Sequence, residues 1–171
     1  NTGGEIRLSN AAKEISFVLE NKELAQSILD RLNGNDISWH VTHNDTKVEN
    51  ILFEASGDAI CLIDFDTVMP GAIAWDIGDS IRSMANSVSE EEQDLTKVNF
   101  LVNHFQAYMQ GYANVMQTIL PVSEVRSIVD GCLVIAFEQA LRFLTDHINH
   151  DQYYPVTYPE QNLTRARVQF T

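Results

Sequence analysis

The chain has 171 residues, of which 44 % are hydrophobic, and a formal net charge of −13 from 24 acidic and 11 basic residues. This length and apolar content predict a single domain over residues 1–171 with one sizeable core, and they exclude a disordered chain. The acidic surface argues against a nucleic-acid partner, and the absence of any apolar run near the roughly 18 residues of a membrane span argues against a membrane partner.

The first predicted element is a helix over residues 10–34. Its apolar positions recur at the three- and four-residue spacing of one helical face, and Gly34 is a natural end. A short stretch rich in β-branched residues follows at residues 37–42 and leads into a polar segment. Two short apolar runs, residues 51–53 and 60–63, predict a β-hairpin around a turn at residues 56–58.

The pattern after the hairpin is helical. Residues 75–85 predict a short helix, and Ser89 with Glu92 resembles a capping box that opens a longer helix. Residues 125–144 predict a third long helix, and residues 149–171 predict an irregular C-terminal segment packed on the domain. The expected fold class is therefore α+β and mainly helical, with one short β-hairpin.

The two cysteines lie in apolar stretches with unrelated spacing. Cys61 and Cys132 therefore predict small, reduced core residues rather than a disulfide or a metal site. No signal-peptide pattern opens the sequence. Because free thiols are typical of a reducing compartment, we expect a cytoplasmic protein.

Polar residues gather at the predicted hairpin. Asp45 precedes the first strand, Asn50 begins it, Asp64 ends the second strand and Asp66 follows. Because a hairpin returns the chain to its starting point, Asn50 and Asp64 should lie side by side, with Asp45 a short loop away. Oxygen ligands gathered in one small volume suit a Mg2+ site that carries phosphates.

The run HNDTKVEN at residues 43–50, followed by IDFD at residues 63–66, resembles the catalytic and metal-binding segments of the protein-kinase-like fold. Among its branches the match is to small-molecule kinases, the aminoglycoside phosphotransferases and choline kinases. The resemblance covers residues 40–82, and the later helices fit the C-terminal lobe of that fold. It implies ATP as co-substrate, Mg2+ as cofactor and a small molecule as acceptor.

The resemblance also implies residue roles. Asp45 is the expected catalytic base at the substrate hydroxyl, and Lys47 is expected to face the transferred phosphate of the nucleotide. Asn50 and Asp64 are the expected Mg2+ ligands that hold the nucleotide. Asp66 is either a further metal ligand or a hydrogen-bonded turn residue.

Two more residues have expected supporting roles, and two positions depart from the pattern. Asp76 is expected to brace the catalytic loop, as is His43. Asn44 stands where the small-molecule kinases usually have glycine, although asparagine tolerates a left-handed backbone. Phe65-Asp66 replaces the Phe-Gly of protein kinases, so a mobile activation segment is not expected.

The sequence also resembles bacterial N-acetylhexosamine 1-kinases, in segments 41–47, 63–71, 142–146 and 162–167. This resemblance implies an anomeric sugar hydroxyl as acceptor. Arg142 and Tyr153 are candidate sugar contacts. Choline, another amino alcohol or an aminoglycoside stays open as the acceptor, and so does the oligomeric state. A metal-dependent phosphohydrolase and a non-catalytic kinase-like domain are the rival functions.

The N-terminal, ATP-binding lobe of such kinases is expected to be absent. Only 44 residues precede Asp45, and they show a helical pattern with no Gly-rich loop between strands. We therefore expect this chain to be a C-terminal lobe that is inactive by itself and binds ATP weakly or not at all.

Overall fold

The computed structural model describes residues 2–171, so Asn1 lies outside the described residues. The chain divides into two compact units. Unit 1 comprises residues 1–26, 87–99 and 136–171, and unit 2 comprises residues 27–86 and 100–135. The single domain expected over residues 1–171 stays a prediction.

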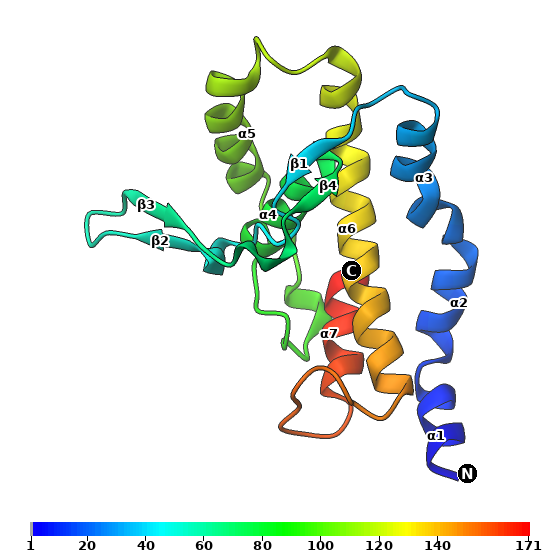
Figure 1. The fold of residues 1–171 in the computed structure, drawn as a ribbon. Helices are drawn as coiled ribbons and strands as arrows, with labels where there is room; N and C mark the ends of the chain where they lie inside the picture. The colour runs from blue at the N-terminus through cyan, green and yellow to red at the C-terminus, as the bar shows by residue number, and fades with distance from the viewer. Residues whose placement is uncertain (1) are drawn as a thin grey trace. The chain divides into compact units, whose positions relative to one another are not determined.

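Unit 1 consists mainly of helices from the two ends of the chain (Figure 1). They are α1 (Thr2–Asn10), α2 (Ala12–Glu20), the start of α3 (Lys22–Asn33), the second half of α6 (Val122–Ile148) and α7 (Gln161–Phe170), together with the 3-10 turn η3 (Leu95–Lys97). Their core contains Ala11, Phe143, Leu144, Leu163 and Ala166. The helix expected over residues 10–34 is divided, because α2 ends at Glu20 and is capped by Asn21, whose backbone N–H bonds back to the last turn.

Two expectations for unit 1 are wrong. The C-terminal segment is not irregular throughout, because α7 occupies Gln161–Phe170 and buries Leu163, Ala166 and Val168. The capping box at Ser89 opens no α-helix either, and the next α-helix begins only at Val102. Glu90 and Glu91, inside the expected helix, instead accept hydrogen bonds from α7 residues. These distant partners hold the segment in an irregular conformation.

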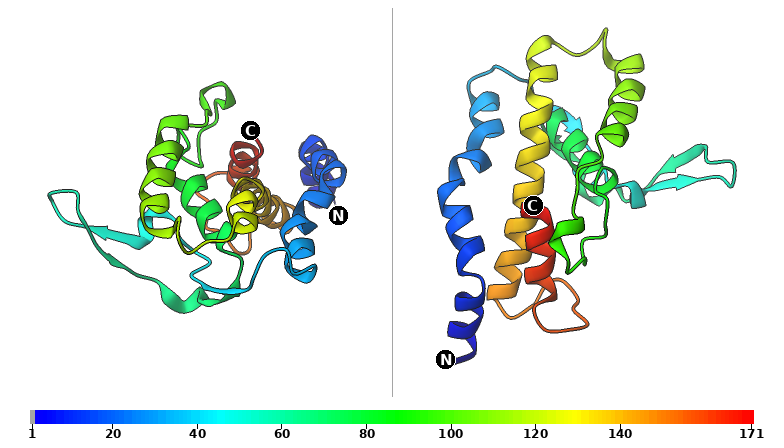
Figure 2. Two further views of the ribbon diagram at one scale, coloured as in Figure 1. Left: turned by 90° about the horizontal axis from the view of Figure 1, so that it is seen from above. Right: turned by 180° about the vertical axis from the view of Figure 1, so that it is seen from behind.

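Unit 2 contains two antiparallel strand pairs. In the first, β1 (His40–Thr42) pairs with β4 (Met69–Gly71), with Val41 opposite Pro70. In the second, β2 (Ile51–Phe53) and β3 (Ala59–Leu62) form the predicted hairpin. The views of Figure 2 show this hairpin extending away from the helices of the unit. The 3-10 turns η1 (Val48–Asn50) and η2 (Phe65–Thr67) adjoin its two strands.

The helices of unit 2 form its core. They are α4 (Ile73–Met84), α5 (Val102–Met116), the first half of α6 and the end of α3. The buried residues are Ile77, Ile81, Ala85 and Ile128, with Phe105 and Met109 packed against them. The long predicted helix over residues 125–144 is confirmed within α6, and so is the mainly helical α+β class. No helix within residues 2–171 has the length and apolar content to cross a membrane.

The two cysteines differ in burial. Cys132 is partly buried against the core of unit 2, whereas Cys61 is exposed on β3. The expectation that Cys61 is a core residue is therefore wrong. All four residues of β3 are exposed, so the apolar run that predicted this strand did not predict burial.

Candidate active site

The loop between β1 and β2 is held by the carboxylate of Asp76 on α4. Its Oδ2 accepts the backbone N–H of His43 at 2.9 Å, and its Oδ1 accepts that of Asn44 at 2.7 Å. Burial is the largest influence on Asp76 and raises the pKa of this carboxyl, although the two N–H donors oppose that effect. These contacts are the ones expected of a residue that braces the loop.

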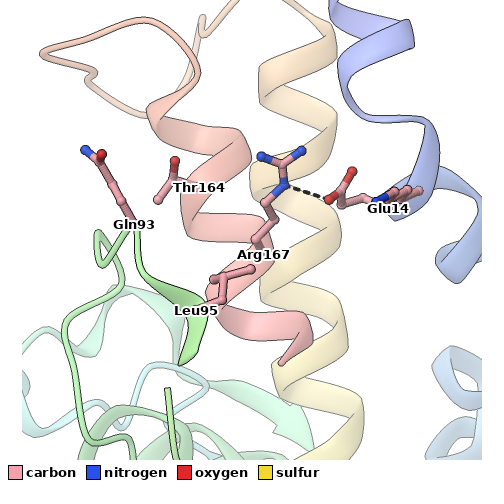
Figure 3. A pocket seen from close by; sticks show the side chains of 6 residues that line it. Glu14, Gln93, Leu95, Thr164 and Arg167 are labelled. Carbon is pink, nitrogen blue, oxygen red and sulfur yellow. Dashed lines mark hydrogen bonds and ion pairs between the residues drawn. The ribbon is translucent and has the colours of Figure 1, made fainter. Parts of the chain in front are cut away.

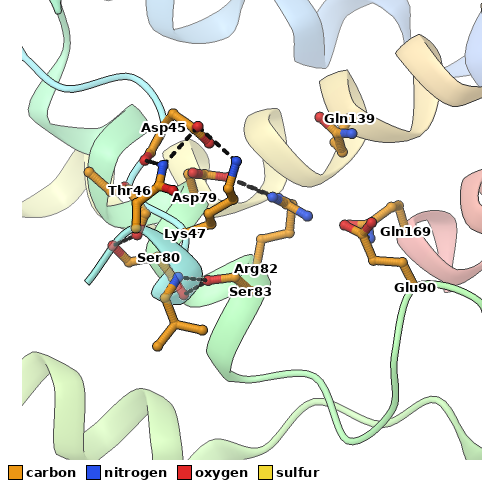
Figure 4. A network of polar contacts seen from close by, with 12 residues as sticks. Asp45, Thr46, Lys47, Asp79, Ser80, Arg82, Ser83, Glu90, Gln139 and Gln169 are labelled. Carbon is orange, nitrogen blue, oxygen red and sulfur yellow. Dashed lines mark hydrogen bonds and ion pairs between the residues drawn. The ribbon is translucent and has the colours of Figure 1, made fainter. Parts of the chain in front are cut away.

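Two serines on the same face of α4 extend this support. Ser80 donates its hydroxyl to the carbonyl of Thr46 at 3.0 Å, and Ser83 accepts the backbone N–H of Val48 at 3.1 Å (Figure 4). Residues 76, 80 and 83 follow the i, i+4, i+7 spacing of one helical face. The loop residues on both sides of Lys47 are therefore fixed to α4.

His43 connects the loop to the segment after β3. Its Nε2 lies 3.0 Å from the carbonyl oxygen of Ile63, and its own carbonyl accepts the Thr67 hydroxyl at 2.7 Å. Its ring packs against Phe65 with the centroids 5.2 Å apart. Asn44 adopts a left-handed backbone with φ of 61°, as expected for a residue that replaces glycine, and its side-chain amide donates to Thr67.

Asp45 is anchored through one of its two carboxylate oxygens. Lys47 Nζ and Asn50 Nδ2 each lie 2.8 Å from Oδ2, and Asn50 also donates to the Asp45 carbonyl at 2.8 Å. Among the described residues, none donates a hydrogen bond to Oδ1. Burial is the largest single influence on the Asp45 pKa and raises it, but the hydrogen bonds from Lys47 and Asn50 together outweigh it, so the pKa is lowered. Asp45 is therefore ionised at neutral pH with one oxygen available.

The hairpin brings Asn50 and Asp64 together, as the sequence predicted. The N–H of Ile63 donates to the Asn50 carbonyl at 2.9 Å, which leaves Asp64 one residue beyond this pair. Asn50 is 5 % exposed, and both hydrogen bonds of its side chain use Nδ2, so its Oδ1 is not engaged by any described residue.

Asp64 and Asp66 are exposed, and neither forms a hydrogen bond or ion pair with a described residue. Asp64 has a left-handed backbone with φ of 68° and ψ of 57°, although its side chain does not cap the following 3-10 turn. A non-glycine residue in this conformation stores local strain, and such strain is common at functional sites. The two carboxylates and Asn50 Oδ1 supply uncommitted oxygen donors.

Asp79 and Arg82 were not singled out from the sequence. Arg82 donates through Nε and Nη2 to the same Asp79 oxygen, Oδ1, at 3.0 and 2.8 Å. Asp79 is 9 % exposed, and its Oδ2 has no hydrogen-bond partner among the described residues. The Asp45 hydrogen bond is the largest cause of a raised Lys47 pKa, and the charges of Asp64 and Asp79 add to it. Polar residues at helical spacing after Asp76 were the signal that could have identified this group.

Arg142 and Tyr153 belong to unit 1, whereas Asp45 belongs to unit 2. The Arg142 guanidinium lies 5.7 Å from the centroid of the Tyr154 ring, and Tyr153 is 73 % exposed. Their role in acceptor binding stays a prediction, since these contacts are confined to unit 1.

Comparison with known proteins identifies a family and a curated relative. A family model described as the phosphotransferase enzyme family matches residues 10–116. The probable ethanolamine kinase of Nematostella vectensis is 29 % identical over 111 residues, which cover 62 % of this chain and 31 % of that protein. The chain thus spans about a third of the length of this relative.

Proposed function

Because the chain belongs to the phosphotransferase enzyme family, we propose that it carries the catalytic loop of a kinase that transfers the γ-phosphoryl group of ATP to the hydroxyl of a small molecule. The observation that carries this proposal is the position of Asp45, whose carboxylate is fixed by Lys47 and Asn50 beside the end of the hairpin that bears Asp64.

The two carboxylate oxygens of Asp45 have different proposed roles. Oδ2 is anchored by the ammonium of Lys47 and the amide of Asn50, which fixes the carboxylate plane. Oδ1 can then accept the hydrogen bond of the acceptor hydroxyl and orient its oxygen for in-line attack. Since the Asp45 pKa is lowered, the carboxylate is ionised at neutral pH and ready for this role.

The uncommitted oxygens at the end of the hairpin are of the chemical type that Mg2+ prefers. Asn50 Oδ1 and the carboxylates of Asp64 and Asp66 are hard ligands that no described residue engages. Asn50 and Asp64 would hold the ion, with Asp66 as a further ligand. Bound Mg2+ would neutralise charge on the nucleotide phosphates.

Lys47 has a second proposed role. Its ammonium bonds to Asp45 and lies within the fields of Asp64 and Asp79, so it stays protonated. A lysine fixed in this position would offset negative charge on the transferred phosphoryl group. Asp76 and His43 act through the backbone, since their contacts hold the loop that carries Asp45 and Lys47.

For the acceptor we propose the anomeric hydroxyl of an N-acetylhexosamine, with an amino alcohol as the competing acceptor. The first rests on the resemblance of segments 41–47 and 63–71, with Arg142 and Tyr153 as candidate contacts. The second is favoured by the name of the relative from Nematostella vectensis, an ethanolamine kinase. Both acceptors present a hydroxyl, so the proposed roles of Asp45 and Lys47 are the same.

The test is ADP release by the full-length protein with Mg2+ and ATP. The acceptors are N-acetylglucosamine, N-acetylgalactosamine, ethanolamine, choline and kanamycin. We expect turnover with an N-acetylhexosamine and a loss in Asp45→Asn of roughly two to four orders of magnitude in kcat. Asp58→Asn is the matched control, because Asp58 is an exposed carboxylate in the hairpin turn that accepts a hydrogen bond from the nearby Ser56 hydroxyl. It should retain full activity.

The outcomes separate the alternatives. Turnover with ethanolamine alone would replace the sugar assignment and keep the reaction. Phosphate release that needs no acceptor and survives in Asp45→Asn would contradict a kinase and favour a metal-dependent phosphohydrolase. Inactivity of the 171-residue chain by itself stays a prediction, and micromolar ATP affinity in this chain would contradict it.

A further inference from the structure

Unit 1 contains a pocket of about 420 Å3, within the typical range of about 300–1,000 Å3 for small-molecule sites. Three segments contribute its lining: α2, the irregular segment before η3 with the start of that turn, and α7 (Figure 3). The lining residues are Lys13, Glu14, Gln93, Leu95, Thr164 and Arg167. None of them belongs to the proposed catalytic site.

The pocket is rich in hydrogen-bond donors that the protein does not use. The side chains of Lys13, Gln93 and Thr164 form no hydrogen bond or ion pair with any described residue. Arg167 bonds through Nε to Glu14 at 2.7 Å and through Nη2 to the Asn10 carbonyl at 3.1 Å, so its Nη1 is uncommitted. The pocket is therefore lined by an ammonium, a guanidinium, an amide and a hydroxyl group.

Two of these donors are held in a defined arrangement. Thr164 and Arg167 are three residues apart on α7 and so lie on the same helical face. Figure 3 shows the polar ends of Gln93, Thr164 and Arg167 on the same side of the hollow, with Leu95 beneath them. The Glu14 contact fixes the direction of the Arg167 guanidinium.

The charge of the lining is net positive, although the chain as a whole carries −13. The lining has two cationic residues, Lys13 and Arg167, and one carboxylate, Glu14, whose Oε1 accepts from Arg167. The acidic residues beside Gln93 are paired elsewhere. Glu92 and Asp94 lie 3.6 and 3.8 Å from Lys97 Nζ.

Glu91 adds no free charge to the pocket either. Its Oε1 lies 2.6 Å from the Arg165 guanidinium. The neighbouring carboxylates are thus engaged by Lys97 and Arg165. The uncommitted groups of the pocket are mainly donors, and Glu14 Oε2 is the one lining carboxylate oxygen with no hydrogen-bond partner among the described residues.

We propose that this pocket binds the phosphate group of a small phosphate monoester. A phosphate dianion accepts hydrogen bonds from ammonium, guanidinium, amide and hydroxyl donors, and all four are present. The pocket is larger than a bare phosphate ion needs, and Leu95 with the Gln93 carbonyl oxygen offers apolar and polar contact to the esterified group. The site is independent of the proposed kinase function.

The test is a titration of the 171-residue chain with glycerol 3-phosphate, in which the NMR chemical shifts of the backbone amides are measured at each concentration. We expect saturating shifts at Gln93 and Thr164 with a Kd on the order of 1 mM. Lys13→Gln should raise the Kd roughly three- to fivefold, the effect of removing one exposed ion pair. Thr164→Val should also weaken binding, because it removes a donor and keeps the shape of the side chain.

Lys22→Gln is the matched control. Lys22 is an exposed lysine in unit 1, outside the pocket, and forms no hydrogen bond or ion pair with a described residue. It should leave the Kd unchanged. Equal weakening by Lys13→Gln and Lys22→Gln would show attraction to overall charge and overturn the site. If sulfate and inorganic phosphate bound as tightly as glycerol 3-phosphate, the contact would be unspecific for anions, which would overturn the assignment to a phosphate monoester. An absence of chemical-shift changes at the pocket would also overturn the proposal.

Discussion

The Asp76 carboxylate on α4 accepts the backbone N–H of His43 at 2.9 Å, across 33 positions of sequence. Its other oxygen accepts the next N–H, so one side chain satisfies two donors of the catalytic loop. Asp76→Ala should lower the free energy of unfolding by roughly 1–3 kcal/mol, because both N–H groups lose their partner. Urea denaturation measures this change. Asp58→Ala, at an exposed turn, should stay within about 0.5 kcal/mol of wild type.

The same residue predicts a pH dependence. Burial raises the Asp76 pKa above its ordinary value of 3.8 despite the two N–H donors. A raised carboxyl pKa gives a contribution to stability that is fully present below pH 3.8 and lost as the pH rises through the folded-state pKa. The unfolding free energy of wild type minus that of Asp76→Asn should therefore fall as the pH rises over this window. Urea midpoints at several pH values test it, and a difference that rises with pH would contradict it.

Asp79 should influence catalysis through Lys47. Asp79→Asn keeps an oxygen for Arg82 but removes a negative charge that acts on the Lys47 ammonium and helps to hold it in position. We expect kcat of the full-length kinase to fall by about tenfold, equivalent to about 1.4 kcal/mol of activation free energy. The same change made in a Lys47→Ala background should have little further effect. An equal loss in both backgrounds would assign Asp79 a purely structural role.

Two helical glycines should respond in opposite directions to alanine. A Cβ at Gly131 on α6 would lie 2.6 Å from the Cβ of Ala74, so Gly131→Ala forces the backbones of α4 and α6 apart. We expect it to destabilise unit 2 by roughly 1–3 kcal/mol. Gly111 on α5 has no atom within 4 Å of a built Cβ, and Gly111→Ala should stabilise by about 0.5–1 kcal/mol. Thermal unfolding of the two variants compares them directly.

The two thiols should differ in reactivity. Burial raises the Cys132 pKa to about 11, whereas Cys61 is exposed on β3. Because the thiolate is the reactive form, iodoacetamide should modify Cys61 quickly and Cys132 only slowly at neutral pH. Mass spectrometry over time measures both rates, with Cys61→Ser as the control that identifies the fast site. Equal rates would contradict the burial of Cys132.

The local parts of the site followed from the sequence. A hairpin turn between two short apolar runs returns the chain to its start, so Asn50 and Asp64 had to meet at its open end. The left-handed backbone of Asn44 was likewise expected from the residue that replaces glycine. These features depend on neighbours along the chain, and local propensity is enough to determine them.

Other features depended on partners that lie far away in the sequence. The sequence pattern did not indicate that Ser80 and Ser83 hold the loop around Lys47. It also did not indicate that one carboxylate oxygen of Asp79 is buried without a hydrogen-bond partner among the described residues. The strand β4 was missed because Pro70 weakens a strand pattern, and its pairing with β1 restores it.

The irregular segment before α5 shows the same limit. Ser89 and Glu92 have the spacing of a helix start, yet Glu91 instead accepts a hydrogen bond from Arg165, 74 positions later. The sequence by itself determined the turn, the helical periods and the residues able to perform the chemistry. Only the tertiary structure decided which backbone groups they hold, because a hydrogen bond between distant residues depends on the packing of whole helices and leaves no periodic trace in the sequence.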